Sequence, residues 1–156
     1  KYVNADIYVN VQGDEPLISP IAINSVINKL IKNKNPNIIA TNGFHKIKNN
    51  NDIKNPNIIK TTFDKNKKVI SFSRNVIPFS YSKNFQYYRQ VGLYAFTKKG
   101  LAIFNRLKPK ILEKTETVEM FRIIENGYSV QMVDVKKPSI SVDTPSDLKK
   151  IKKIIK

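Results

Sequence analysis

Two aspartates in this sequence each follow an apolar, extended segment and precede a segment with a helical pattern. Asp14 closes the run "DIYVNVQGD" (6–14), and Asp143 stands inside "SISVDTPSDL" (139–148). In open α/β sheets ligands bind beyond the carboxyl ends of strands, and Mg²⁺ takes one or two protein carboxylates together with phosphate oxygens. The placement therefore predicts that Asp14 and Asp143 share one Mg²⁺ and a triphosphate. Position alone is equally compatible with solvated turn acids or a helix-capping acid.

Holding the two acids at one edge of a sheet requires strands that alternate with helices. The residue patterns predict strands at 5–11, 37–43, 58–64, 67–74, 89–97 and 128–135, and helices at 19–33, 98–108, 114–127 and 143–156. The Asn-rich stretch 45–57 is expected to be a mobile loop. This order predicts one α/β domain over 1–156, with a mixed, mostly parallel sheet flanked by helices. A turn at 64–66 adds an antiparallel hairpin.

Composition narrows the classes of function. The 156 residues include 28 basic and 12 acidic ones, for a net charge of +16, but only four of the basic residues are arginines. Readout of bases favours arginine, and the lysines are scattered, so we expect no nucleic-acid partner; a basic binding module around "NFQYYRQ" (84–90) is the rival interpretation. The absence of cysteine excludes disulfides and thiolate metal sites. No apolar run is long enough to span a bilayer, and we expect no membrane partner.

Six segments, in order along nearly the whole chain, resemble one enzyme family. They are "NVQGDEPLI" (10–18), "NPNIIKTTFD" (55–64), "FSRNVIPF" (72–79), "RQVGLYAF" (89–96), "TETVEMFRIIENG" (115–127) and "VDTPSDL" (142–148). Together they resemble the 3-deoxy-manno-octulosonate (Kdo) cytidylyltransferases, also called CMP-Kdo synthetases. The resemblance implies a nucleotide-diphospho-sugar transferase-like, Rossmann-like fold. It also implies an Mg²⁺-dependent reaction of CTP with Kdo that gives CMP-Kdo and pyrophosphate for lipopolysaccharide biosynthesis. A cytoplasmic homodimer, with its interface around 74–90, is implied as well.

The same resemblance assigns roles to individual residues. Asp14 and Asp143 become the metal-binding and catalytic pair. Arg74, as a catalytic residue, and Lys60 become candidate contacts to phosphate or to the sugar carboxylate. Hydroxyl groups of the sugar are expected to meet Gln12, Gln90, Tyr94 and Glu119. Plainer interpretations stay open for several of these. Tyr94 is also compatible with a core position, Glu119 with a solvated helix face paired with Arg122, and Arg74, Lys60 and the weaker candidate Arg89 with structural ion pairs.

Two departures from the family pattern limit the interpretation. Gln90 stands where the family has histidine, and Met120 stands where some members have glutamine. The substrate is therefore open to a related sugar acid, such as an amino-substituted Kdo or a nonulosonic acid. By the same resemblance we expect these 156 residues to lack the family's N-terminal strand and phosphate-binding loop, and we therefore expect residues 1–156 alone to be poorly stable and inactive. A non-catalytic dimerisation protein is a further alternative, against which the presence of both aspartates weighs.

Overall fold

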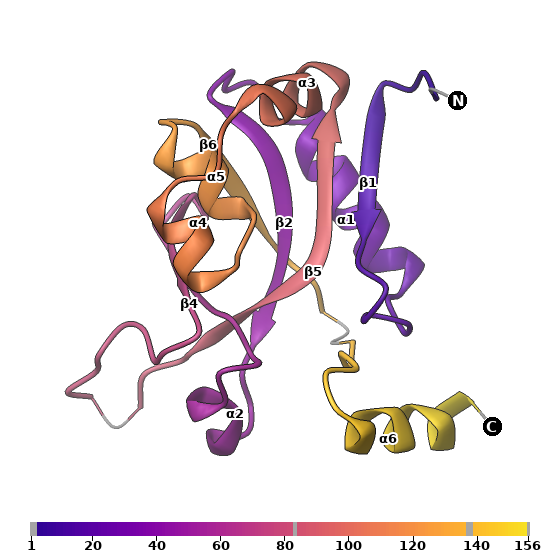
Figure 1. Ribbon diagram of the computed structural model, residues 1–156, viewed down its shortest axis with the longest axis vertical. Helices are drawn as coiled ribbons and strands as arrows, with labels where there is room; N and C mark the ends of the chain where they lie inside the picture. Colours follow the sequence, from indigo (N-terminus) through magenta and orange to yellow (C-terminus); the bar gives the residue numbers. More distant parts are fainter. Residues whose placement is uncertain (1–2, 83, 137–138, 156) are drawn as a thin grey trace.

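The computed structural model describes residues 3–82, 84–136 and 139–155. Its strands are β1 (Ile7–Val11), β2 (Ile38–Lys46), β3 (Lys60–Phe63), β4 (Val69–Ser73), β5 (Tyr88–Thr97) and β6 (Ser129–Asp134). Its helices are α1 (Pro20–Ile31), α2 (Asn50–Lys54), α3 (Lys98–Arg106), α4 (Ile111–Glu116), α5 (Met120–Glu125) and α6 (Pro145–Ile155). Figure 1 shows these elements arranged around one twisted sheet, with α6 projecting at one end.

The sheet is built around the long strand β5. Its order is β4-β3-β5-β2-β6, and β1 pairs with β5 outside that path. The α/β class, the mixed sheet and the hairpin of β3 with β4 are as predicted from the sequence. The expectation of a mostly parallel sheet is wrong: among the described strands only β2 and β6 pair in parallel. The reason is that β5 runs antiparallel to both β1 and β2, which point the same way on either side of it.

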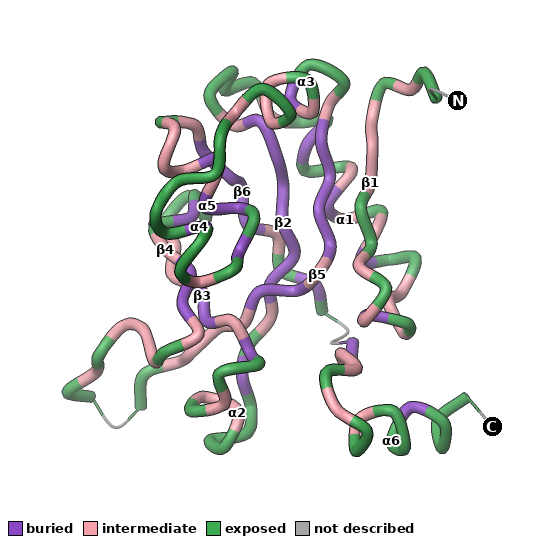
Figure 2. Tube along the Cα trace, viewed as in Figure 1, coloured by how far each residue is buried: buried purple, intermediate pink, exposed green. Residues whose placement is uncertain are grey.

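Alternation along β5 divides the core into two layers. Val91, Leu93 and Ala95 pack with α1, whereas Tyr94 and Phe96 belong to the cluster that includes α5 and reaches α3. Figure 2 shows the burial concentrated in β2 and β5, with no buried residue in α2 and most of α6 exposed. The helix ends follow the local signals. Ser19 caps α1 by accepting a hydrogen bond from the backbone N–H of Ala22 (3.2 Å).

Two sequence-based expectations about single elements are wrong. The segment 114–127 is two short helices, because Thr117 adopts the left-handed conformation (φ 54°) that ends α4. The stretch 45–57 is not a continuous loop, because β2 extends to Lys46 and α2 follows, with Asn49 accepting a hydrogen bond from the backbone N–H of Asn51. After the break at Thr117, Val118 and Met120 belong to the same core cluster as Tyr94 of β5.

Alanine at Gly100 is expected to lower the free energy of unfolding by about 1–3 kcal/mol, the range for overpacked sites. Gly100 lies in the first turn of α3, and a Cβ there would stand 2.3 Å from the backbone oxygen of Ile39. Urea titration measures the change, with Gly13→Ala as the control because a Cβ at Gly13 meets nothing within 4 Å. Equal urea midpoints for the two variants would contradict this prediction and show that α3 and β2 move apart without loss of stability.

Candidate functional site

A polar cavity of about 160 Å³ opens where β1 and β3 diverge along the same edge of β5. Both strands are continued by a hydrogen bond to β5. The N–H of Gln12, just after β1, donates to the backbone oxygen of Gly92, and the N–H of Gln90 donates to the backbone oxygen of Ile59, just before β3 (both 2.9 Å). The cavity is closed by the junction of α4 and α5 and by residues 141–143. Seven of the eight predicted site residues line it, namely Gln12, Asp14, Arg74, Gln90, Tyr94, Glu119 and Asp143.

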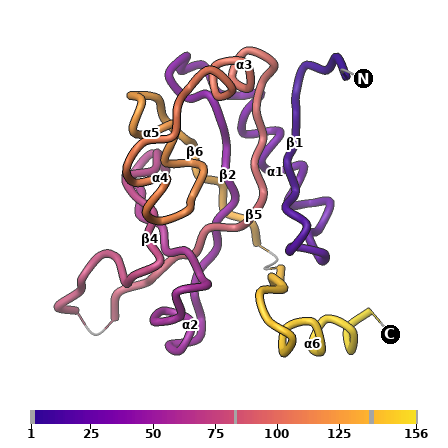
Figure 3. Tube along the Cα trace, in the orientation of Figure 1, coloured from indigo at the N-terminus to yellow at the C-terminus, as the bar shows by residue number. Residues whose placement is uncertain are grey.

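Asp14 and Asp143 meet although 129 positions separate them (143 − 14). The backbone N–H of Val142 donates to the backbone oxygen of Asp14 at 2.8 Å, which ties the segment before α6 to the end of β1. Figure 3 shows these two distant parts of the chain side by side. Oδ1 of Asp14 is buried and has no hydrogen-bond partner among the described residues. Oδ2 of Asp143 accepts from the Ser141 hydroxyl at 3.2 Å.

This donor set fits a hard cation that brings its remaining ligands with it. Within the described residues, no group of three or more histidine, cysteine, aspartate or glutamate side chains could hold a metal. Two carboxylates are what Mg²⁺ commonly takes from a protein when phosphate oxygens and water supply the other positions. The unpartnered oxygen of Asp14 is in keeping with such a ligand. The role of the two aspartates as metal ligands stays a prediction.

Glu15 and Arg89 add a buried ion pair at the back of the cavity. Glu15 is 4% exposed, and its Oε1 lies 3.6 Å from Nη2 of Arg89. The same guanidinium nitrogen donates to the Ser141 hydroxyl at 3.2 Å, and that hydroxyl donates in turn to Asp143. Arg89 therefore connects the end of β1 with the segment that carries Asp143. Sequence analysis gave Arg89 only a minor place and missed Glu15 and Ser141 as site residues.

The Glu15→Gln variant is expected to gain stability relative to the wild-type protein as the pH rises. Burial raises the pKa of Glu15, and Arg89 offsets only part of that effect. The folded protein thus holds this proton more tightly than the unfolded chain, whose glutamate has a pKa of about 4.3. Wild-type stability must then fall as pH rises from that value through the folded pKa, whereas Glu15→Gln cannot show this loss. Urea unfolding of both proteins between about pH 4 and 7 checks the sign; a constant difference would contradict it.

Gln12, Tyr94 and Glu119 face the cavity from three elements. The Gln12 side chain lies against Gly92, where an added Cβ would stand 2.7 Å from its Oε1, so glycine makes room for it. Tyr94 is 4% exposed, and burial together with nearby acids, Glu119 first among them, raises the pKa of its phenol. The phenol therefore stays protonated at neutral pH and is able to donate a hydrogen bond. Glu119 lies immediately before α5, where the break at Thr117 brings it to the cavity.

Arg74 lines the cavity and also holds its wall together. Its guanidinium donates to the backbone oxygens of Glu116 (2.9 Å) and Pro56 (3.0 Å) and to the Thr117 hydroxyl (2.9 Å). The Glu116 carboxylate accepts from the Arg74 backbone N–H and from the Ser73 hydroxyl (both 2.8 Å). Since arginine has five N–H donors, two remain for a ligand. The predicted catalytic contact of Arg74 is thus compatible with a structural one.

Lys60 has a structural position rather than the predicted place beside a phosphate. It is fully buried and does not line the cavity. Its ammonium donates to the backbone oxygens of Asn55, Ile58 and Arg74, which accounts for all three of its hydrogens. Desolvation lowers the pKa of Lys60, and Glu116 partly offsets this. The sequence pattern around Lys60 shows a lysine in a motif, but it does not show that backbone carbonyls surround it.

Asn42, Asn57 and Thr117 belong to the site or its support, and sequence analysis missed them. Asn57 and Thr117 line the cavity, and Asn42 lies behind Gln90. Asn42 carries no local signal because it lies in a buried strand. Asn57 and Thr117 stand within the quoted segments 55–64 and 115–127, which were the available clues. No helix among the described residues is both long and apolar enough to cross a membrane.

Comparison with known proteins gives consistent matches over nearly the whole chain. A family model described as cytidylyltransferase matches residues 1–153. The 3-deoxy-manno-octulosonate cytidylyltransferase of Chloroherpeton thalassium is 39% identical over 99% of this chain, and that of Fusobacterium nucleatum is 35% identical over 100% of it. This chain spans only 64% and 63% of the lengths of these two relatives.

Solved structures support the same fold. A CMP:2-keto-3-deoxy-manno-octonic acid synthetase complexed with CTP superposes with a TM-score of 0.86 at 27% identity. The match covers 98% of this chain and 63% of that one. The inositol-1-phosphate CTP transferase from T. maritima gives a TM-score of 0.60 at 18% identity, covering 99% of this chain and 56% of that one, a likeness of fold alone. The arrangement around β5 is therefore shared with nucleotidyltransferases.

Proposed function

This chain belongs to the cytidylyltransferase family, and from that membership we propose that its protein activates 3-deoxy-manno-octulosonate with CTP. In the proposed reaction a hydroxyl oxygen of the sugar acid forms a bond to the α-phosphorus of CTP. The bond from that phosphorus to the bridging oxygen breaks, pyrophosphate leaves, and the hydroxyl proton goes to solvent. The observation that carries the proposal is the single cavity that gathers Gln12, Asp14, Tyr94, Glu119 and Asp143.

Each group in the cavity has a task in this proposal. Asp14 and Asp143 hold Mg²⁺, which when bound would neutralise charge on the phosphates. The protonated phenol of Tyr94 and the carboxylate of Glu119 bind hydroxyl groups of the sugar, and Gln12 does so from the end of β1. Arg89 or the free N–H groups of Arg74 take the sugar carboxylate, for which guanidinium is suited. Positioning and charge neutralisation are the main requirements of such a phosphorus-centred transfer.

The test is pyrophosphate release by the protein as encoded, with any sequence that flanks these 156 residues. We expect release from CTP and Mg²⁺ to depend on added Kdo and to be absent with CTP alone. An amino-substituted Kdo and a nonulosonic acid are offered in parallel, because Gln90 replaces the family's histidine. Preference for one of these two sugar acids would support the cytidylyltransferase reaction with that sugar acid, in place of Kdo, as the substrate. No release with any sugar acid would contradict the proposal.

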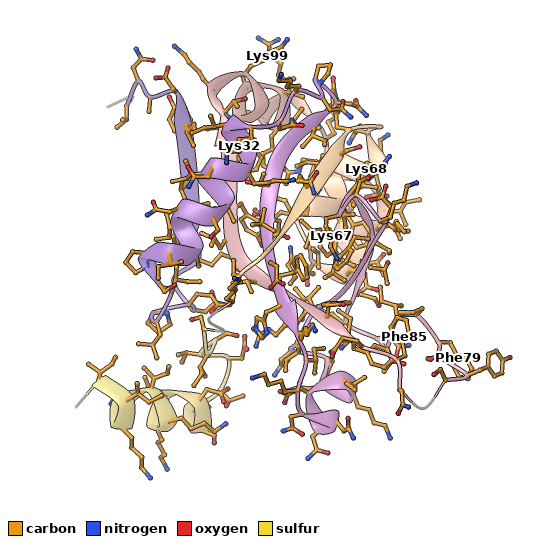
Figure 4. The ribbon with its side chains drawn as sticks, turned by 180° about the vertical axis from the view of Figure 1, so that it is seen from behind. Lys32, Lys67, Lys68, Phe79, Phe85 and Lys99 are labelled. Carbon is orange, nitrogen blue, oxygen red and sulfur yellow. The ribbon has the colours of Figure 1, made fainter. Side chains whose placement is uncertain are left out.

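We further propose that the protein is a homodimer that works in the cytoplasm, where CTP is available. The segment between β4 and β5 extends away from the sheet, and Figure 4 shows Phe79 near its outer end. Phe79 is 80% exposed and Tyr81 97% exposed, and their rings contact each other edge to face. Aromatic residues are enriched at protein interfaces, so a second copy of the chain is a suitable partner for this segment.

Serine at both Phe79 and Tyr81 is expected to convert the dimer into a monomer, because the two rings are then lost from the interface. Sedimentation velocity at micromolar concentration measures the change. Ile111→Ser is the control, since Ile111 is equally open (78% exposed) but lies on α4. A dimer that persists in the double variant would place the interface elsewhere.

A further inference from the structure

Three aromatic side chains from neighbouring strands come together on one face of the sheet. Phe44 on β2, Phe63 at the end of β3 and Tyr88 at the start of β5 each contact the other two, with ring centroids 4.5, 5.4 and 5.0 Å apart. Phe44 is buried, whereas Phe63 and Tyr88 are half-buried. The three rings, called the aromatic cage below, therefore belong to the core and also reach the surface.

Lys67 places its ammonium group over the aromatic cage. The Nζ atom lies 4.4 Å from the ring centroid of Phe63, 5.6 Å from that of Phe44 and 5.9 Å from that of Tyr88. All three distances are within the range of about 6 Å at which the face of an aromatic ring attracts a cation. Among the described residues no carboxylate lies within ion-pair distance of this ammonium. Its charge is therefore held by ring faces and not by an acid.

The backbone of the turn between β3 and β4 brings Lys67 to the cage. The N–H of Lys67 donates to the backbone oxygen of Asp64 (2.9 Å), and its φ of 64° lies in the left-handed region. Its own oxygen accepts from the backbone N–H of Met132 (2.8 Å) and from Nε2 of Gln131 (3.0 Å). A side chain makes the left-handed conformation costly, yet a lysine stands here instead of glycine. The backbone of Lys67 is thus fixed on both sides, which leaves its side chain directed at the rings.

The same contacts join the two edges of the sheet. The strands β4 and β6 are the ends of the order β4-β3-β5-β2-β6, and Lys68 forms an isolated bridge with Gln131 of β6. Figure 4 shows Lys67 and Lys68 beside β6. The rings of the cage come from β3, β5 and β2, which lie between those two edges. The ammonium of Lys67 therefore lies where the hairpin of β3 and β4 closes over the sheet.

We propose that the aromatic cage is a binding site for an organic ammonium cation, and that Lys67 is its resident ligand, supplied by the chain itself. Ring faces without a paired carboxylate favour an alkylammonium group, whereas hard metal ions need oxygen ligands. The bound charge holds the hairpin of β3 and β4 against β6, and a free alkylammonium ion takes the site once Lys67 is removed. Neither Lys67 nor any ring of the cage lines the cavity with Asp14 and Asp143, so this site is separate from the one proposed for CTP and the sugar acid.

The absence of cysteine from these 156 residues allows the charge to be tested by itself. In the protein as encoded, with any thiol of flanking sequence replaced by serine, the thiol introduced by Lys67→Cys is alkylated with bromoethyl-trimethylammonium or with its neutral tert-butyl isostere. The two adducts share one shape and differ in charge.

In urea unfolding we expect the charged adduct to have a folding equilibrium constant about fivefold above that of the neutral adduct, the size of one cation–π contact at an exposed site. The same pair of adducts on Lys68→Cys is the matched control and should show no difference, because Lys68 is also exposed in this turn and its ammonium lies over none of the three rings. A neutral adduct of Lys67→Cys as stable as the charged one would overturn the proposal, since apolar contact alone would then hold the side chain.

A titration tests whether the cage accepts a free cation. Tetramethylammonium chloride is added to Lys67→Ala and to the wild-type protein, with sodium chloride at equal concentration as the control for ionic strength. We expect saturable shifts of the Phe63 and Tyr88 ring signals, and a raised urea midpoint, in Lys67→Ala alone. Equal shifts in the wild type would overturn Lys67 as the resident ligand, and no shift in the folded variant would overturn the ammonium site.

One measurement requires no substitution. In the wild-type protein the Cε protons of Lys67 should resonate upfield of those of the exposed control Lys68, because only the former lie over aromatic ring faces. Coincident Cε signals for the two lysines would overturn the proposal even if Lys67→Ala and Lys67→Cys fail to fold.

Discussion

Asparagine at either Asp14 or Asp143 is expected to lower the rate of sugar-dependent pyrophosphate release by about 100- to 1,000-fold, the scale seen when one electrostatic contact to a transition state is removed. Asparagine keeps the shape of aspartate and removes its charge. The lost charge matters because the described residues offer no third carboxylate or histidine to complete a metal-binding group. The two single variants should fall together, and the double variant should fall little further, because residues that act as a unit are not additive.

The matched control is Asp6→Asn, an exposed aspartate just before the opposite end of β1. It makes the same chemical change beside the same strand and should retain the wild-type rate. Titration of each purified variant with Mn²⁺ plus CTP, followed by electron paramagnetic resonance, supplies a readout that does not depend on turnover. Weaker Mn²⁺ binding in the Asp14 and Asp143 variants would support their assignment as metal ligands. A wild-type rate in either variant would show that the substituted aspartate is not needed for the reaction.

Methionine at Lys60 is expected to destabilise the fold by about 3 kcal/mol, the lower end of the range for breaking a buried charged contact. The ammonium of Lys60 bonds to three backbone oxygens contributed by the segment before β3 and by the residue after β4. Methionine fills nearly the same volume but leaves those oxygens without their donor, and each unsatisfied buried group costs free energy. The favourable electrostatic interaction of the Glu116 carboxylate with the charged lysine is lost as well.

Urea unfolding of Lys60→Met and Lys99→Met makes the comparison. Lys99 is exposed on α3, as Figure 4 shows, and its variant should unfold at the wild-type urea concentration. A KM for CTP that rises in Lys60→Met while the unfolding midpoint stays unchanged would restore the interpretation of Lys60 as a phosphate contact. A lowered midpoint with an unchanged KM is the expected result.

The elements that were predicted well have strong local signals. The cap at Ser19 and the proline after it mark the start of α1, and the turn after Asp64 is stabilised by its carboxylate, which accepts from the N–H groups of Asn66 and Lys68 (both 2.8 Å). The prediction failed where a distant contact decides the outcome. At the helix break, the guanidinium of Arg74 donates to the backbone oxygen of Glu116 at the end of α4, a contact between residues 42 positions apart (116 − 74). Periodicity over 114–127 contains no trace of that contact.

The directions of the strands in the sheet show the same limit of prediction from sequence. Alternating strands and helices do indicate that β1 and β2 run the same way, but the sequence does not show that β5 inserts between them. The two aspartates were predictable as cavity residues because the type of residue and its place in the motif coincide, although only Asp14 lies just beyond a strand, and the described residues directly before Asp143 form no strand. Asn42 was not predictable, since a buried strand residue gains its role only from the strand beside it.

The pairing of β1 with β5 also sets the order in which this protein takes shape during synthesis. Ile7 lies opposite Thr97, 90 positions later (97 − 7). At 5–20 residues per second a ribosome needs roughly 5 to 18 s to cover that interval, and during this time β1 has no β5 to pair with. Contacts this far apart in sequence also slow folding after release. The hairpin of β3 and β4 is free to form early, whereas the pairing of β1 with β5, beside which Asp14 lies, comes late and leaves that edge of β1 without its partner strand meanwhile. Protection by a chaperone in that interval should therefore affect the yield of native protein more than any later step.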